Sequence, residues 1–176
     1  MFKFNRIFLL LLIFSFTNVH AEVFYIDLDK IMNQSKPGIY INNIINDLQK
    51  KNQETVSKKR EDLKKREEKL INQKNILSNE EFNLKLNELK SDINQFNKDN
   101  QVNRQEIQKK LINYKTNLLK MIEPILLEYV NQNNIKYLLQ KKYIIVGHND
   151  FNKTNEIIDI VNQKIDVSKL NDWNLK

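Results

Sequence analysis

Residues 56–96 read VSKKREDLKKREEKLINQKNILSNEEFNLKLNELKSDINQF, and this stretch decides the fold. Apolar residues recur in it every seventh position, first as Val56, Leu63, Leu70 and Leu77 and then as Phe82, Leu89 and Phe96. Apolar heptads of this kind are typical of α-helices that supercoil around a partner helix. The stretch therefore predicts two helices that pack along a common seam.

The chain is expected to reverse between the two apolar rows, in the segment Leu77-Ser78-Asn79-Glu80-Glu81. Ser78 and Glu81 have the three-residue spacing of a capping box, which begins a helix. Ile41 and Lys115 each lie 37 residues from Ser78, so the two arms match in length. We therefore expect an antiparallel helical hairpin over residues 41–121, with arms of roughly 55 Å at about 1.5 Å per residue.

The seam of this hairpin is unevenly filled. In the first arm the second heptad position is polar, at Lys59, Arg66 and Gln73. The second arm carries a longer row at the same spacing: Leu86, Ile93, Asn100, Ile107, Tyr114 and Met121. Asn100 and Asn103 interrupt its seam with polar layers. Buried polar layers lower the stability of a coiled coil. We therefore expect long arms that bend and separate easily.

The residues before the hairpin predict a strand and a brief helix. Val23-Phe24-Tyr25-Ile26-Asp27-Leu28 is rich in the aromatic and β-branched residues that strands prefer. Asp29 is expected to cap a helix that runs through Gln34, and Lys36-Pro37-Gly38 to break the chain.

The residues after the hairpin predict a bend, two strands and a helix. Pro124 either kinks the second arm or begins a new helix that runs through Val130. Tyr137-Leu138-Leu139 and Tyr143-Ile144-Ile145-Val146 have strand composition, and Asn155 to Ile165 has the apolar spacing of an amphipathic helix.

Three short strands from distant parts of one chain cannot bury a core alone, and their open edges favour pairing with other copies. The fold class is therefore α+β, mainly α, with the hairpin projecting from a small β-containing body that oligomerisation completes. The body is expected at residues 22–40 and 122–166, with a flexible tail at 167–176. The residues expected to join the copies are Val23, Tyr25, Tyr137, Leu139, Ile144 and Val146.

Residues 1–21 have the three parts of a secretory signal. Lys3 and Arg6 precede an apolar run from Ile7 to Phe16, and the predicted cleavage lies between Ala21 and Glu22. The run is short for a membrane span, which needs about 20 residues, although an uncleaved anchor is the alternative interpretation. Export places the mature chain in the periplasm and argues against nucleic acid as a partner.

Positive charge is concentrated on the hairpin. The segment from Lys50 to Lys120 holds 18 basic and 11 acidic residues. The densest group is Lys58, Lys59, Arg60, Lys64, Lys65, Arg66 and Lys69. One interpretation is an ordinary solvated helix surface with ion pairs. The other is a client-binding basic face, which attracts acidic polypeptide or an anionic lipid or lipopolysaccharide surface.

The sequence lacks the residues that enzymes and metal sites usually need. It has no Cys, so thiol nucleophiles and thiolate metal ligands are excluded. After cleavage His148 is the sole histidine, and no phosphate-binding loop or metal-ligand spacing is present. We therefore expect no cofactor, no metal and no enzymatic activity.

The order of elements resembles the Skp (OmpH-like) family of periplasmic chaperones. The resemblance rests on the opening Val23-Phe24-Tyr25-Ile26-Asp27, the segment Asn134-Ile135-Lys136-Tyr137-Leu138-Leu139, and the closing Lys153-Thr154-Asn155-Glu156-Ile157-Ile158. The sequence departs from the family at Phe151-Asn152-Lys153-Thr154, which lacks the usual acidic residue.

This resemblance implies a jellyfish-shaped homotrimer that holds unfolded outer-membrane proteins without ATP. The alternative that the residues leave open is a non-enzymatic structural or adaptor protein of the cell envelope.

Overall fold

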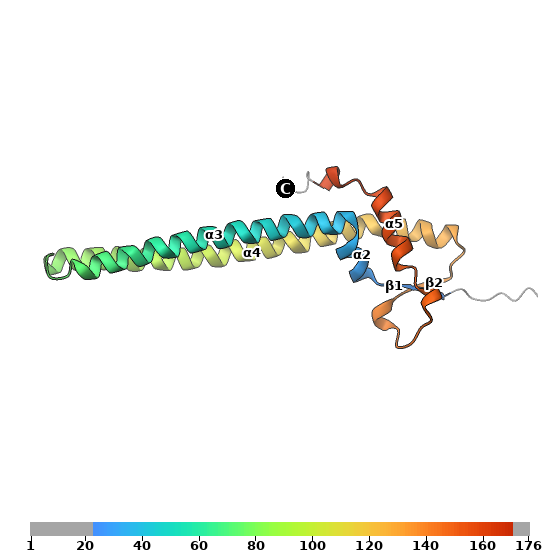
Figure 1. The fold of residues 1–176 in the computed structure, drawn as a ribbon, viewed down its shortest axis with the longest axis horizontal. Helices are drawn as coiled ribbons and strands as arrows, with labels where there is room; N and C mark the ends of the chain where they lie inside the picture. Colours follow the sequence, from blue (N-terminus) through green and yellow to red (C-terminus); the bar gives the residue numbers. More distant parts are fainter. Residues whose placement is uncertain (1–22, 171–176) are drawn as a thin grey trace, which may run out of the picture.

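The computed structural model describes residues 23–170. The expected signal peptide, its cleavage point at Ala21 and Glu22, and Trp173 lie outside these residues. Figure 1 shows two long helices, α3 and α4, running side by side away from a compact base that holds the short elements. The elements are β1 Val23–Ile26, α2 Leu28–Gln34, α3 Lys36–Asn72, α4 Asn79–Gln132, β2 Tyr137–Gln140, η2 Lys141–Tyr143, η3 Asn149–Phe151 and α5 Thr154–Lys164.

The hairpin reverses at residues 73–78, so the turn begins four residues before the predicted segment, and α4 begins after Ser78 as the capping box predicts. The Ser78 hydroxyl accepts a hydrogen bond from the Glu81 backbone N–H at 3.2 Å. The Glu81 carboxylate accepts one from the Ser78 backbone N–H, also at 3.2 Å. These reciprocal bonds satisfy two backbone donors at the start of α4. The capping box and the antiparallel hairpin are therefore confirmed.

The segment Lys36-Pro37-Gly38 does not break the chain as expected. It forms the first turn of α3, because Ser35 caps the helix and its hydroxyl accepts from the Gly38 N–H at 3.3 Å. Pro37 is tolerated there since the first helical N–H groups have no partner within the helix. Gly38 is required by space, since a Cβ at this position would lie 2.1 Å from the Met32 carbonyl oxygen.

The expected cap of α2 is also wrong, and one of the two alternatives for Pro124 is excluded. The cap of α2 is Asp27 rather than Asp29, and its carboxylate accepts from the Lys30 N–H at 2.9 Å. No new helix begins at Pro124, which lies inside the continuous helix α4. Pro124 is exposed, and the carbonyl four residues before it lacks its usual helical donor.

The described residues contain one small sheet. β1 and β2 pair in parallel, with Val23 opposite Tyr137 and Ile26 opposite Gln140. The third expected strand, residues 143–146, does not form. This segment has no neighbouring strand to supply backbone hydrogen bonds, and the Ile145 side chain is fully exposed. Strand composition without a pairing partner does not make a strand.

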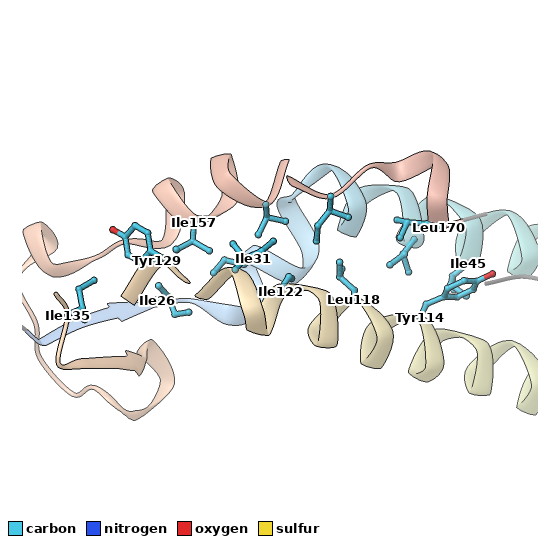
Figure 2. Packing of buried hydrophobic residues seen from close by; sticks show 14 residues of the cluster. Ile26, Ile31, Ile45, Tyr114, Leu118, Ile122, Tyr129, Ile135, Ile157 and Leu170 are labelled. Atoms are coloured by element: carbon cyan, nitrogen blue, oxygen red, sulfur yellow. The ribbon is translucent and has the colours of Figure 1, made fainter. Parts of the chain in front are cut away.

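Helices build most of the core in the base, which corrects the expectation that the body depends on its strands. Figure 2 shows Ile31 of α2, Ile122 of α4 and Ile157 of α5 gathered in one cluster. All three side chains are fully buried. Leu170 also packs into this cluster, so residues 167–170 are not the loose tail that the sequence predicts.

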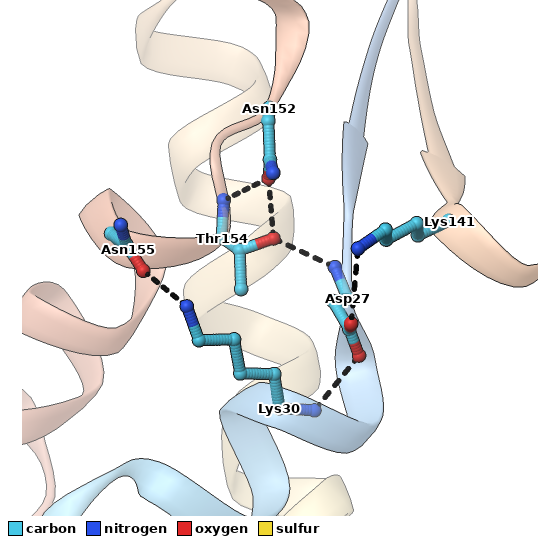
Figure 3. A network of polar contacts seen from close by, with 6 residues as sticks. All are labelled: Asp27, Lys30, Lys141, Asn152, Thr154 and Asn155. Atoms are coloured by element: carbon cyan, nitrogen blue, oxygen red, sulfur yellow. Dashed lines mark hydrogen bonds and ion pairs between the residues drawn. The ribbon is translucent and has the colours of Figure 1, made fainter. Parts of the chain in front are cut away.

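A polar network ties the closing helix to the first strand. Figure 3 shows the Thr154 hydroxyl between Asn152 and the backbone of Asp27. This hydroxyl accepts from the Asp27 N–H at 2.8 Å and donates to Asn152 Oδ1 at 2.6 Å. Asn152 Oδ1 also accepts from the Thr154 N–H. Asn152 thus accepts two hydrogen bonds at the start of α5.

Candidate functional site on the hairpin

The hairpin has two apolar clusters with a polar middle between them. The base cluster reaches Ile45 of α3 and Tyr114 of α4. The tip cluster is built on Leu63, Leu70 and Leu89. Neither helix has a fully buried residue in the interval between these clusters. Since apolar burial is the main force that holds two helices together, the arms are most weakly joined in the middle.

Two grooves lie in this polar middle, and both are lined by Asn52 and Val56. The first has a volume of about 550 Å³. Its lining residues are Gln49, Asn52, Gln53, Val56, Ser57, Arg60, Arg104, Ile107 and Gln108. The second has a volume of about 440 Å³ and is lined mainly by residues of α4 between Asp92 and Asn103. The shared residues place the grooves at the same level of the hairpin, on either side of the seam.

The two grooves differ in charge. The first, which we call the arginine groove, is lined by two arginines and by no carboxylate. The second is lined by Lys59, Asp92 and Asp99. An anionic group is therefore attracted to one side of the hairpin rather than to both.

Asn100 explains part of the loose packing in this region. It occupies a seam position, and its side-chain oxygen is buried without a hydrogen-bond partner among the described residues. A buried acceptor without a donor costs about 1–3 kcal/mol. The asparagine layer therefore weakens the joint between the arms.

The seven basic residues that the sequence groups as one face are distributed around α3. A helix turns by about 100° per residue. At that rate Lys58 and Lys65 fall on the side away from the buried Leu63 and Leu70, whereas Lys69 lines a groove between the arms together with Arg66 and Leu70. Lys59 and Arg66 flank the seam on one side, and Arg60 and Lys64 flank it on the other.

Four of these seven residues form ion pairs. Within α3, Lys59 pairs with Asp62, Lys64 with Glu68 and Lys65 with Glu61, while Arg66 reaches across the hairpin to Asp92 at 2.7 Å. The hydrogen bond that Lys65 donates to the Glu61 carboxylate, together with the negative charge of that carboxylate, raises the pKa of Lys65. Among residues 23–170, Lys58, Arg60 and Lys69 have no carboxylate within ion-pair distance.

The residues expected to join copies of the chain lie at the far end of the base. Tyr25 is buried and Ile144 is half-buried. The other four are exposed: Val23, Tyr137, Leu139 and Val146. Ile145 and Tyr143, which belong to the same loop region, are exposed as well. The structure therefore leaves these six apolar or aromatic side chains exposed in the base.

Sequence reasoning missed two features of the hairpin. It did not single out Arg104, although Arg104 follows the seam residue Asn100 by four positions and so lies on the same side of α4. It also missed the exposed side chains Ile71, Ile76 and Leu84 around the tip. These three residues lie outside the heptad rows, which could have indicated that their side chains do not face the partner helix.

The described residues offer little for catalysis or membrane insertion. No group of three or more metal-ligating side chains occurs among residues 23–170. None of the helices in that range combines the length and apolar character that crossing a membrane requires. His148 pairs with Asp150 in an exposed turn and lines neither groove.

The described residues thus form a long basic hairpin with open grooves, rooted in a small mixed base. The sequence matches the family model described as "Outer membrane protein (OmpH-like)" over residues 22–161. The chain therefore belongs to the OmpH-like family.

The fold also resembles a known crystal structure, described as that of a "putative outer membrane chaperone (OmpH-like)" from Caulobacter crescentus CB15. The match has a TM-score of 0.79 at 10% sequence identity and covers 83% of this chain and 86% of that chain. At this identity the likeness extends to the fold alone. None of the curated proteins matches the sequence.

Proposed function

We propose that the protein is an ATP-independent holdase chaperone of the periplasm, which binds unfolded outer-membrane β-barrel proteins and prevents their aggregation. Membership of the OmpH-like family supports a chaperone role. The observation that carries the proposal is the weakly joined middle of the hairpin. Two open grooves there replace the filled seam that a purely structural coiled coil would have.

The chemistry of the hairpin suits the loose retention of an unfolded chain. Its arms expose basic side chains together with scattered apolar ones, such as Ile76, Leu84 and Ile112. Each charged contact is weak because it is exposed and screened by salt, and each apolar contact is weak because it buries little surface. Many weak contacts retain a chain that lacks structure and still allow its release without ATP.

The proposal includes assembly through the base, as a homotrimer with the hairpins around a shared space. It is supported by the exposed apolar side chains around β2 and the following loop. An uncovered apolar surface of this kind favours burial against other copies. Sedimentation of the mature protein would measure the number of copies directly.

An aggregation assay tests the holdase proposal. A urea-denatured outer-membrane β-barrel protein is diluted into buffer with and without the mature protein, in the absence of ATP, and light scattering is followed. We expect scattering to be suppressed at low salt and less so at high salt. Unchanged scattering at a molar excess of the mature protein would rule the proposal out.

A further inference from the structure

The arginine groove differs from the rest of the basic hairpin in that its cations are not paired. Arg60 comes from α3 and Arg104 from α4, and both line the same groove. The third arginine among the described residues, Arg66, is held by Asp92 at 2.7 Å. Neither Arg60 nor Arg104 has a carboxylate within ion-pair distance among residues 23–170.

Arginine is the side chain best suited to hold an oxyanion at such a place. Its planar guanidinium offers several donors in a fixed arrangement that matches a carboxylate or a phosphate. Two guanidinium groups from opposite arms can therefore converge on one anionic group. No lining residue of the groove carries a negative charge that would compete.

The rest of the lining favours a polypeptide over a simple ion. Four carboxamide side chains surround the groove: Gln49, Asn52, Gln53 and Gln108. A carboxamide both donates and accepts, which matches the N–H and C=O groups of a peptide backbone, whereas a phosphate needs donors only. Val56 and Ile107 add apolar surface for the carbon atoms of an extended chain.

We propose that the arginine groove is a binding site for acidic polypeptide segments, in which Arg60 and Arg104 hold a carboxylate and the carboxamides hold the adjacent backbone. This inference deepens the proposed holdase function, on which it rests, by assigning the acidic parts of the client to one side of the hairpin. The groove with Asp92 and Asp99 on the other side is not part of the site.

Fluorescence anisotropy of a short labelled peptide that alternates glutamate with serine tests the site on the mature protein. The variant Arg60→Gln/Arg104→Gln removes both guanidinium groups. The matched control Lys58→Gln/Lys109→Gln removes the same charge from the same two helices but leaves the lining of the groove intact. All four side chains are exposed, so helix content by circular dichroism should be unchanged.

We expect the arginine variant to weaken peptide binding by about fivefold or more, and the lysine control by less than about twofold. A peptide with glutamine in place of glutamate should bind the wild type about as weakly as the acidic peptide binds the arginine variant. Equal losses in both variants would overturn the inference, because they would indicate a diffuse charge effect. Failure of the wild type to bind the acidic peptide at low salt would overturn it as well.

Inorganic phosphate, added as a competitor at constant ionic strength, separates the two sources of an oxyanion. Weak competition by phosphate would support a peptide site. If phosphate displaced the labelled peptide as effectively as unlabelled acidic peptide does, the groove would be a simple anion site and the inference would be wrong. The readout is independent of aggregation. If peptide binding depends on the arginines while the aggregation assay shows no protection, the holdase proposal fails and the peptide site stands.

Discussion

Thr154 is a single buried hydroxyl that connects three segments of the base. Its oxygen accepts from the Asp27 N–H at the end of β1 and donates to Asn152 ahead of α5. A valine of nearly the same shape would leave the Asp27 N–H without its partner. The hydroxyl therefore fixes how the last helix sits against the first strand.

Replacement of this hydroxyl gives the first prediction. Thr154→Val should lower the free energy of unfolding by about 1–3 kcal/mol, the cost of leaving a buried donor unpaired. The control is Thr55→Val, since the exposed Thr55 hydroxyl bonds only within its own helix. It should change stability by less than about 0.5 kcal/mol. Urea denaturation of all three proteins measures the difference, and equal stability of Thr154→Val and wild type would contradict it.

Asn100 is the second residue whose side chain should strongly affect stability, and it gives the second prediction. Its side-chain oxygen is buried in the seam without a donor among the described residues. Asn100→Leu should therefore stabilise the hairpin by about 1 kcal/mol, because it removes an unpaired acceptor and adds apolar contact. Thermal unfolding should show a higher Tm, while the exposed neighbour change Asn97→Leu should leave Tm unaltered. A lower Tm for Asn100→Leu would mean that the asparagine is satisfied.

At the scale of elements, the start of α4 depends on a charge-assisted cap. Hydrogen bonds from the Ser78 backbone and hydroxyl lower the pKa of the Glu81 carboxyl. A carboxyl with a lowered pKa contributes stability above its unfolded pKa of about 4.3, and this contribution is lost as the pH falls through the lower folded value. The turn of the hairpin should therefore loosen at acid pH.

An NMR titration of Glu81 checks this third prediction. In the wild type the carboxyl should titrate below the ordinary value for glutamate. In Ser78→Ala, which removes the hydroxyl, its pKa should move back toward that value. Ser57→Ala, a change in the middle of α3, provides the control and should leave the titration of Glu81 unchanged. A wild-type pKa at the ordinary value would contradict the cap as described.

The two apolar clusters of the hairpin should open independently. Leu89 is central to the tip cluster, and Ile122 is fully buried in the base cluster. Truncation of a buried aliphatic side chain to alanine costs about 2–5 kcal/mol. Because a polar middle separates the clusters, we expect Leu89→Ala to promote unfolding of the tip alone. We expect Ile122→Ala to lower the stability of the whole fold.

Hydrogen exchange distinguishes these outcomes. In Leu89→Ala, amide exchange should accelerate between residues 60 and 95 and stay slow in the base. In Ile122→Ala, the slowest exchanging amides of the base should accelerate. Uniform acceleration over the whole hairpin and base in Leu89→Ala would show that the two clusters unfold as one unit.

The elements that the sequence predicted well are those whose determinants are local. The capping box at Ser78 and Glu81 spans only four residues, and the heptad rows need only the helical period. The segment Lys36-Pro37-Gly38 has two local interpretations, a break or a first turn. The contact of Gly38 with Met32, which helps to decide between them, is visible only in three dimensions.

Features that depend on contacts between distant segments of the chain were harder to predict. The strand composition of residues 143–146 does not show whether a neighbouring strand exists. The arginine groove requires the register between α3 and α4, which decides that Arg60 and Arg104 face the same space. Heptad spacing predicts which side of each helix faces the partner. It does not predict the register, which decides which turn of α3 lies opposite which turn of α4.

At the scale of the whole molecule, exposed apolar side chains occur at both ends. Ile145 and Val146 of the base are 100% and 89% exposed, and Ile76 at the tip is 81% exposed. Exposure alone therefore does not distinguish an assembly surface from a surface that contacts clients. Their surroundings differ, since Ile145 and Val146 follow β2, whose outer edge has no strand partner among the described residues, whereas Ile76 lies in the turn between α3 and α4.

Matched charge substitutions separate these two roles. Ile145→Asp/Val146→Asp places two carboxylates on the proposed assembly surface, where burial would leave them unpaired and strongly disfavour association. Sedimentation should then show a smaller species than the wild type, and Ile76→Asp should leave the species unchanged. An oligomer that survives the base substitutions, or a wild type that sediments as a single chain, would mean that this end of the base does not join copies. Because both sites are fully solvated in the single chain, neither change should unfold it, so the difference in sedimentation reports association alone.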